Sequence, residues 1–424
     1  MFSRRMEGVK ESATIKMAAL ARALRKEGEK VLDFSLGEPD FSTPPHICEA
    51  AKRAMDAGFT HYVPSAGIPE LREEIAIKIR EENRVDVSAE NVIVTPGAKQ
   101  AIFAAMMSIL NEGDEVIMLE PAWVSFEAAI RMAGGKPIWL LRRDKPVNYD
   151  MMSSVVSEKT RMIVINSPNN PVGYVMEERE LREIAEFASD HNVLVMSDEI
   201  YEKIIYEKKH VSIASLDAMS ERTIIINGFS KTYAMTGWRV GYAVAPVEIV
   251  NTMLKIQQHS VTCASSISQY AALEALRSSQ ECVYEMVSEF KRRRDLIVRR
   301  LRDIGFACEM PDGAFYVFAG IPTLSTSSAS SSTSSSSTSS SASSSASSST
   351  SSSTSSSASS PNSQNEQKDD VAFAEMLLRD THIVVTPGSA FGNAGRNYVR
   401  FSYAASIEEI SEGMARIEKL ISSH

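Results

Sequence analysis

A lysine and an arginine lie close together in a stretch of small and apolar residues past the middle of the chain. The stretch, residues 227–245, reads NGFSKTYAMTGWRVGYAVA and contains Lys231 and Arg239. Most lysines of folded proteins are solvated, so Lys231 alone is more often a surface residue than a catalytic one. A lysine held in a pocket can, however, form a Schiff base with an aldehyde, and an arginine can bind a phosphate. The pair therefore suits opposite ends of one ligand better than a simple helical pairing.

Polar side chains follow four of the predicted strands at the point where each strand ends. The segments are TPGAKQA (95–101), NSPNNPVG (166–173), SDEIY (197–201) and NGFSK (227–231). Ligands of open α/β sheets bind outside the carboxyl ends of the strands. The four segments therefore predict one shared pocket, although each of them alone also suits an ordinary turn or helix cap.

The residue types at these strand ends match the needs of one cofactor. Asp198 could pair with a protonated pyridine nitrogen, although it could equally cap a helix. Gly97 and Ala98 open a predicted helix, whose free N–H groups favour a phosphate. Ser230 and Arg239 add further donors for a phosphate. With an aldehyde for the lysine, these are the requirements of pyridoxal 5′-phosphate. The chain has no G-x-G-x-x-G motif, so a dinucleotide site of the usual kind is not predicted.

Composition excludes several other classes of protein. The 424 residues suggest two or three domains, and 45 basic against 54 acidic residues argue against a nucleic-acid partner. No run of 18 apolar residues and no apolar leader occur, so we expect a cytoplasmic protein without a membrane segment. The four cysteines form no C-x-x-C pair and are expected to be reduced, and the seven scattered histidines do not predict a metal site.

Short β-rich runs alternate with helical stretches over most of the chain. Val/Ile/Leu runs that alternate with helices favour an α/β fold with a mostly parallel sheet covered by helices on both faces. Seven strands are predicted at 91–96, 115–120, 137–141, 161–166, 192–199, 222–227 and 238–245, with helices such as 98–111 and 177–190 between them.

The pattern changes near residue 285, where a long charged helix precedes three strand-like runs. We expect a large cofactor-binding domain at 46–284 and a smaller α+β domain at 285–424. The N-terminal segment 1–45, with a helix at 12–27, should join the smaller domain. Residues 325–360 are only Ser, Thr and Ala, so we expect 325–370 to be a disordered insertion, because it cannot bury enough apolar surface to fold.

Taken in order, the motifs resemble those of the class I and II aminotransferases, which are pyridoxal-phosphate enzymes of fold type I. The resemblance covers nearly the whole chain outside the Ser-rich tract, and it is strongest to the bacterial and archaeal type of aspartate aminotransferase. Besides the four strand-end segments, it rests on SLGEPDF (35–41), YVPSAGIPELR (62–72), FSKTYAMTGWRVGY (229–242), GAFYVF (313–318) and VRFSYA (399–404). A single motif of this kind would be weak evidence, whereas the ordered set is specific.

The resemblance implies catalytic roles for several residues. Lys231 would be the Schiff-base lysine, and it would then move a proton between the substrate α-carbon and C4′ of the cofactor. Asp198 would pair with the pyridinium nitrogen. Asn170 and Tyr201 would hydrogen-bond the phenolic oxygen. Trp123 would stack on the ring and border the substrate, although it could also be a plain core aromatic residue.

The resemblance also implies how phosphate and carboxylate groups are bound. The phosphate would lie in a cup formed by Gly97, Ala98, Lys99, Ser230 and Arg239. Tyr62 would reach the phosphate from the neighbouring subunit, which implies a homodimer with shared active sites. Arg400 would bind the substrate α-carboxylate through two hydrogen bonds, with Asn170 beside it and Gly37 contributing its backbone. Without the resemblance, Arg400 and Gly37 would suggest only a surface arginine and a turn.

The choice of substrate depends on a second cation. Lys99 would read the distal carboxylate of an acidic substrate, assisted by Thr14. Residues 255–266 offer no arginine for that task, unlike the animal-type aspartate aminotransferases. Related prephenate enzymes tend to carry an arginine where this chain has Lys10. The resulting hypothesis is an aspartate:2-oxoglutarate aminotransferase of amino-acid metabolism and biosynthesis that works by a ping-pong mechanism.

Two other interpretations remain open from the sequence. One is a different enzyme on the same scaffold: an aromatic, kynurenine-type or prephenate aminotransferase, or a C–S β-lyase. The other is a non-catalytic regulatory module that binds pyridoxal phosphate. Such regulators carry a DNA-binding domain, and we expect neither an extra N-terminal domain nor a basic one here.

Overall fold

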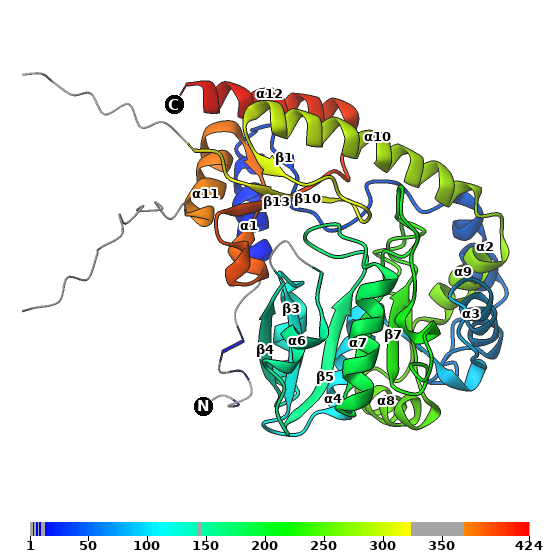
Figure 1. Ribbon diagram of the computed structural model, residues 1–424. Coiled ribbons are helices and arrows are strands. Elements are labelled where there is room, and N and C mark those ends of the chain that lie inside the picture. The colour runs from blue at the N-terminus through cyan, green and yellow to red at the C-terminus, as the bar shows by residue number, and fades with distance from the viewer. Residues whose placement is uncertain are drawn as a thin grey trace, which may run out of the picture.

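The computed structural model describes residues 3, 6, 8, 9, 13–142, 146–323 and 369–423, and of residues 13–18 it describes the backbone alone. Figure 1 shows a large sheet flanked by helices, with two small sheets and further helices above it. The strands are β1 (Leu32–Asp33), β2 (Val92–Thr95), β3 (Glu115–Glu120), β4 (Lys136–Leu141), β5 (Thr160–Asn166), β6 (Leu194–Asp198), β7 (Thr223–Gly228), β8 (Gly241–Val244), β9 (Ala307–Cys308), β10 (Tyr316–Gly320), β11 (Ile383–Val384), β12 (Thr386–Pro387) and β13 (Tyr398–Ser402).

Helices make up most of the remaining described chain. They are α1 (Ala13–Lys26), α2 (Pro45–Asp56), α3 (Pro69–Glu82), α4 (Ala98–Ile109), α5 (Val124–Met132), α6 (Tyr149–Ser153), α7 (Glu178–Asp190), α8 (Val247–Ser260), α9 (Ser266–Arg277), α10 (Glu281–Ile304), α11 (Asp370–Thr381) and α12 (Ile407–Ser422). Among these helices, none is long and apolar enough to cross a membrane.

The large sheet has seven strands in the order β2-β8-β7-β6-β5-β3-β4. β8 runs antiparallel to both of its neighbours, and the other neighbouring pairs are parallel. The α/β fold with a mostly parallel seven-stranded sheet is therefore confirmed. The connection between β7 and β8 forms turns and contains no crossover helix of the kind that usually joins parallel strands, which agrees with the antiparallel direction of β8.

Alternating side chains bury both faces of this sheet. In β3, Val116 and Met118 pack into a core with residues of α4, α5 and α8, whereas Ile117 between them packs into a core with residues of α7. Successive residues of a strand point to opposite faces, so an unbroken apolar run is what a sheet covered on both sides requires. The parallel strands thus end at a common edge, and that edge is the one available for a ligand.

The small domain comprises the two smaller sheets with α1, α10, α11 and α12. Its four-stranded sheet has the order β12-β13-β10-β9, and β1 pairs in parallel with β11. α1 packs on β11 and β12, so the N-terminal segment joins the C-terminal part of the chain. Figure 1 shows α10 reaching over from the large sheet and lying beside α12. The domain boundaries at residues 45 and 284 stay a prediction.

The Ser-rich tract falls outside the described residues from 324 to 368. The described chain resumes at Asp369, whose side chain accepts hydrogen bonds from the backbone N–H groups of Val371 and Ala372 and so caps α11. All four cysteines lie within the described chain, and each is a free thiol.

Candidate active site

A cavity of about 670 Å³ opens where the parallel strands of the large sheet end, and residues of the small domain complete its wall. The segments that follow β2, β5, β6 and β7 all contribute to it, so the structure brings together the four polar strand ends. The predicted site residues that line it are Gly37, Ala98, Lys99, Trp123, Asn170, Asp198, Tyr201, Ser230, Lys231, Arg239 and Arg400.

Lys231 lies in the turn after β7, with its amine at the cavity. Its Nζ donates a hydrogen bond to the backbone oxygen of Gly37. Burial lowers the pKa of this amine to about 8, while the carboxylate of Glu38 opposes the shift and Arg239 supports it. A lysine with a pKa near 8 is partly neutral at neutral pH, so it can act as a base or a nucleophile.

Asp198 ends β6 and is 4% exposed. Burial raises the pKa of its carboxyl to about 7, although the backbone N–H of Ile200, 3.1 Å from Oδ1, opposes the rise. The neighbouring carboxylate of Glu199 raises the pKa further. A carboxyl poised near neutrality becomes ionised when a cation is brought beside it. Asp198 is therefore suited to hold a positively charged atom of a ligand.

Two glycines allow the strands around the Lys231 turn to come close together. A Cβ on Gly228 would lie 2.9 Å from Cα of Gly241, and a Cβ on Gly241 would lie 2.5 Å from the backbone nitrogen of Ala98. Close approach, and not an unusual backbone angle, therefore accounts for Gly228. The packing brings the start of α4 next to the end of β7.

Arg239 has a left-handed backbone with φ of 53°. Such a conformation costs about 1–3 kcal/mol outside glycine and is concentrated at functional sites. It also ends the turn late, so β8 begins at Gly241 and not at 238 as predicted. The guanidinium lies against Gly97, where a Cβ would be 2.6 Å from Nη2. The strained residue thus brings a cation to the N-terminus of α4, where Ala98 and Ser230 also line the cavity.

Arg400, on β13, joins the two domains at the cavity. It is 3% exposed, and its Nη1 donates to Oδ1 of Asn170 at 2.8 Å while its Nη2 donates to the backbone oxygen of Ser35 at 2.7 Å. Its Nε has no hydrogen-bond partner among the described residues. A buried arginine without a carboxylate partner is costly, so its position favours a ligand that carries a carboxylate or phosphate.

Two tyrosines meet between Asp198 and Arg400. The hydroxyls of Tyr201 and Tyr316 lie 2.7 Å apart, and the guanidinium of Arg400 lies 4.3 Å from the ring centre of Tyr316. Burial raises the pKa of both phenols, so both stay protonated at neutral pH. If Tyr316 donates to Tyr201, the Tyr201 proton is left for a ligand oxygen.

A second group of cations, Lys99 and Arg22, lines the cavity besides Lys231, Arg239 and Arg400. Nζ of Lys99 is 4.8 Å from the ring centre of Trp123, and burial lowers its pKa, with Arg239 acting in the same direction. Arg22 of α1 also lines this cavity. Among the described residues, no carboxylate forms an ion pair with Lys99 or Arg22. The cavity therefore has a second place for a negative group.

Some predicted residues lie elsewhere. Gly97 stands beside the cavity without lining it, and Tyr62 is 86% exposed and lies away from it. The side chain of Thr14 and all of Lys10 are outside the described part of the chain.

A family model for aminotransferase class I and II matches residues 29–417. The chain belongs to this family. This aminotransferase is 40% identical to an aspartate aminotransferase of Pyrococcus abyssi, over 99% of this chain and 98% of the relative. It is 38% identical to aromatic-amino-acid aminotransferase 2 of Thermococcus litoralis, over 99% of this chain and 98% of that one. The structure of aspartate aminotransferase from Thermus thermophilus with maleate is similar as well, with a TM-score of 0.86, 36% identity and 99% of each chain covered.

Sequence reasoning missed several residues around the site of this aminotransferase. Tyr316 was present in the motif GAFYVF, so its place in that motif could have identified it. Asn166 was visible at the end of β5; it donates to the backbone oxygen of Asp198 at 2.9 Å and accepts from the N–H of Asn170 at 2.8 Å. Arg22 gave no signal, because an arginine in an Ala/Leu-rich helix is typical of a solvated face.

Proposed function

We propose that this aminotransferase uses pyridoxal 5′-phosphate to transfer the amino group of an L-amino acid, above all aspartate, to 2-oxoglutarate in a ping-pong reaction. The observation that carries the proposal is the meeting of Lys231, Asp198 and Arg239 in one cavity. The family is known for this cofactor, and a relative with 40% identity is named an aspartate aminotransferase.

The side chains around the cavity fit this cofactor. Arg239, Ser230 and the free N–H groups at the start of α4 would hold the phosphate, and the absence of a Cβ at Gly97 leaves room for the guanidinium. Trp123 would cover one face of the ring, and Asp198 would hold its protonated nitrogen. When bound, the cofactor supplies an aldehyde and a ring that withdraws electrons from the substrate α-carbon.

Lys231 carries the proton in the proposed reaction. With a pKa of about 8, its neutral amine would accept the proton of the substrate α-carbon and deliver it to C4′ of the cofactor. Tyr201 and Asn170 would donate to the phenolic oxygen, with Tyr316 orienting the Tyr201 hydroxyl 2.7 Å away. Asp198, ionised beside the ring nitrogen, would keep that nitrogen protonated.

Arg400 would bind the α-carboxylate of the substrate. A guanidinium can bind a carboxylate through two parallel hydrogen bonds, worth about 1.5–3 kcal/mol each. The donors of Arg400 now point to Ser35 and Asn170, and its Nε has no partner among the described residues. Gly37, two residues after Ser35, would contribute its backbone to the same carboxylate.

The second group of cations supports an acidic substrate. Lys99 would bind the distal carboxylate, and we add Arg22 as a further cation for it. Neither has a carboxylate partner among the described residues, and both line the cavity. Thr14 would assist from the N-terminal segment, as its place in the sequence suggests.

A homodimer and a cytoplasmic location are part of the same proposal. Tyr62 is 86% exposed, which is consistent with a side chain that reaches the phosphate site of a second copy. We also propose the domain division at 1–45, 46–284 and 285–424. Sedimentation of the purified chain would test the dimer, and Tyr62→Phe should weaken cofactor binding only if Tyr62 reaches the partner's site.

Spectra of the bound cofactor with a panel of amino acids would test the proposed substrate. Aspartate and glutamate should convert the visible absorbance of the cofactor fastest in single-turnover mixing. Faster conversion by aromatic or small neutral amino acids would overturn the acidic assignment. Release of ammonia and pyruvate would indicate a β-lyase, and a band that no amino donor converts would indicate a binding module.

An aromatic or prephenate substrate is the second candidate. Leu36, Trp123 and Phe391 give the cavity an apolar wall, and one relative is named an aromatic-amino-acid aminotransferase. The same panel distinguishes the two, because an apolar side chain gains nothing from Lys99 and Arg22.

A further inference from the structure

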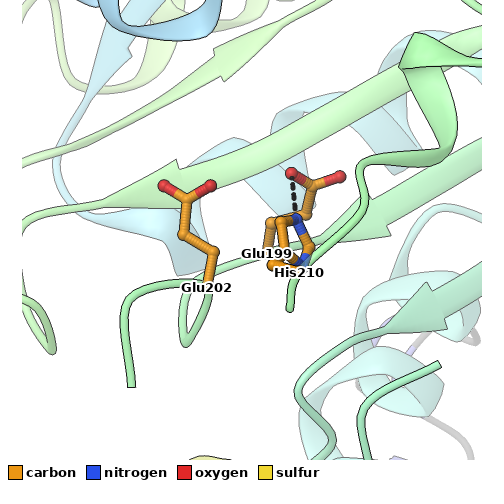
Figure 2. Close-up of side chains that lie close together, drawn as sticks. All are labelled: Glu199, Glu202 and His210. Atoms are coloured by element: carbon orange, nitrogen blue, oxygen red, sulfur yellow. Dashed lines mark hydrogen bonds and ion pairs between the residues drawn. The ribbon is translucent and has the colours of Figure 1, made fainter. Parts of the chain in front are cut away.

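A buried cluster of charged side chains lies behind Asp198, on the side away from the cavity. Figure 2 shows Glu199, Glu202 and His210 together, with Nε2 of His210 2.9 Å from Oε2 of Glu199. Asp198 and Glu199 are consecutive residues at the end of β6, so their side chains point to opposite sides. Asp198 lines the cavity, whereas Glu199 is completely buried and lines none of it.

Every carboxylate oxygen of this cluster has a hydrogen-bond donor. Nδ2 of Asn83 bridges the two glutamates, at 3.1 Å from Glu199 and 2.7 Å from Glu202. Lys78 of α3 binds Oε1 of Glu202, which also accepts from Asn227 at 2.8 Å. The remaining oxygen of Glu199 accepts from the hydroxyls of Ser197 at 2.9 Å and Ser212 at 2.7 Å.

The cluster does not need a metal ion. The carboxylate and imidazole donors lie within 4.8 Å of one another, as they would around a metal. The ammonium of Lys78, however, already supplies positive charge to Glu202. An added divalent cation would have to displace that ammonium and the bridging amide of Asn83.

Charge balance gives His210 a specific task. Glu199, Glu202 and Lys78 carry a net charge of minus one. Glu82, 3.5 Å from Lys78, is balanced by its own ion pair with Lys203, so the cluster is neutral only when His210 is protonated. We propose that His210 is a positioning residue for Asp198: through Glu199 it holds the end of β6 and offsets the negative charge beside that carboxylate. Nδ1 of His210 has no partner among the described residues, so the polar hold on the ring is the contact with Glu199.

The pKa shifts of these groups agree with that role of His210. Burial lowers the pKa of His210, but Glu199 and then Glu202 outweigh burial, so the pKa is raised above 6.5; Lys78 opposes the rise. The nearby Glu199 charge raises the pKa of Asp198. A neutral His210 would leave that charge uncompensated and would make Asp198 harder to ionise. Burial raises the pKa of Glu202, but Lys78 and then His210 outweigh burial and lower it to about 2, so Glu202 stays ionised at neutral pH.

This inference rests on the proposed role of Asp198, and its test is cofactor affinity as a function of pH. Binding of pyridoxal phosphate to the apoprotein should fall as the pH drops through the pKa of Asp198, because a protonated Asp198 cannot hold a cationic ring nitrogen. His210→Gln keeps an N–H donor for Glu199 but removes the charge. In this variant the acid limb, which is the pH range over which cofactor affinity falls, should move upward by about one pH unit. Binding at pH 7 should weaken by up to about tenfold.

Two further variants separate charge from structure. Glu199→Gln removes the charge that disfavours ionised Asp198, so it should move the acid limb downward, opposite to His210→Gln. Ser212→Ala removes a neutral hydrogen bond from Glu199 and should leave the limb in place. The inference is overturned if all three variants shift the limb in the same direction, or if none shifts it.

The outcomes also separate this inference from the proposed function. A wild-type chain that binds no pyridoxal phosphate at any pH would refute the proposed function itself. A wild-type chain that binds it, with the limb unmoved in His210→Gln and Glu199→Gln, would refute only the role of His210. If His210→Gln does not fold, His210→Asn takes its place: the same upward shift is expected, and an unmoved limb refutes the role of His210.

Discussion

The end of β6 separates a region whose cations lack carboxylate partners in the described part of the chain from a region whose carboxylates are fully hydrogen-bonded. On the cavity side, Lys99 and Arg22 have no carboxylate partner among the described residues, and Nε of Arg400 has no hydrogen bond. On the other side, Glu199 and Glu202 are buried with a donor at every carboxylate oxygen. Only one residue step, from Asp198 to Glu199, lies between them.

The difference distinguishes binding from support. Burying an incompletely paired charge is unfavourable, so a fold that keeps one next to a cavity is selected for a ligand that completes the pairing. A buried network whose carboxylate oxygens all have donors fixes the backbone and leaves no carboxylate free for a ligand. Substitutions on the cavity side should therefore change catalysis directly, whereas those in the network should change stability and act on the cofactor only through Asp198.

Lys231→Ala should have the largest effect of the substitutions on the cavity side. Removing the proton carrier should lower turnover by roughly 10²–10⁴-fold or more. The Tm of the apoprotein should hardly fall, because burial already disfavours the charged amine, whose pKa is lowered to about 8. Calorimetry of the apoprotein beside a transamination assay checks both halves. A large loss of Tm would contradict the expectation that Lys231 serves catalysis and contributes little to stability.

Glu202→Ala is the corresponding break in the network. It leaves the ammonium of Lys78, with a side chain only 10% exposed, without its buried partner, and should lower stability by about 3–5 kcal/mol. Because the folded pKa of Glu202 is about 2 against 4.5 unfolded, its contribution is complete above pH 4.5 and disappears as the pH falls towards 2. In denaturant unfolding, the difference in stability between the wild type and Glu202→Ala should therefore be smaller at pH 3 than at pH 7. The exposed Glu81→Ala on α3, the helix that carries Lys78, is the control and should change little.

Lys99→Ala tests whether the cavity favours acidic substrates over aromatic ones. It should lower kcat/KM for aspartate by about 10- to 100-fold, since a hydrogen bond to a charged group is lost. The value for phenylalanine should fall much less, because its side chain has no distal carboxylate. Equal losses for the two substrates would mean that Lys99 serves the phosphate alone.

Arg22→Gln is expected to have the smallest effect of the four. Arg22 is solvent-exposed, so its contribution to acidic substrates should be only about two- to fivefold in KM. The effect should shrink in high salt. Lys26→Gln, one turn further along α1 and outside the cavity lining, is the matched control. Equal effects of both substitutions would point to general attraction of anions.

Much of the fold was predictable because it depends on local patterns. Apolar runs such as 115–120 form strands, and the polar residues that follow them mark the carboxyl edge of the sheet. The place of Asp198 and Lys231 at the cavity could be predicted for the same reason, since Asp198 ends such a run and Lys231 lies three residues after one. The late start of β8 at Gly241 was not predictable, because it depends on the left-handed backbone of Arg239.

The network behind Asp198 was beyond the sequence for a different reason. Asn83 and Lys78 come from α3, more than a hundred residues before Glu199 and Glu202. No spacing rule connects residues that meet only when a helix docks on the end of a strand. The contribution of Arg22 likewise depends on which way α1 faces once it packs on β11 and β12.

The short segment after β1 has a mechanical consequence. The backbone oxygen of Ser35 accepts from Arg400, and that of Gly37, two positions later, accepts from Lys231. This segment thus occupies one donor of each cation with its own carbonyl groups. A ligand that takes both of these donors would displace both carbonyl groups, so binding the substrate and freeing the lysine would be coupled through one stretch of backbone.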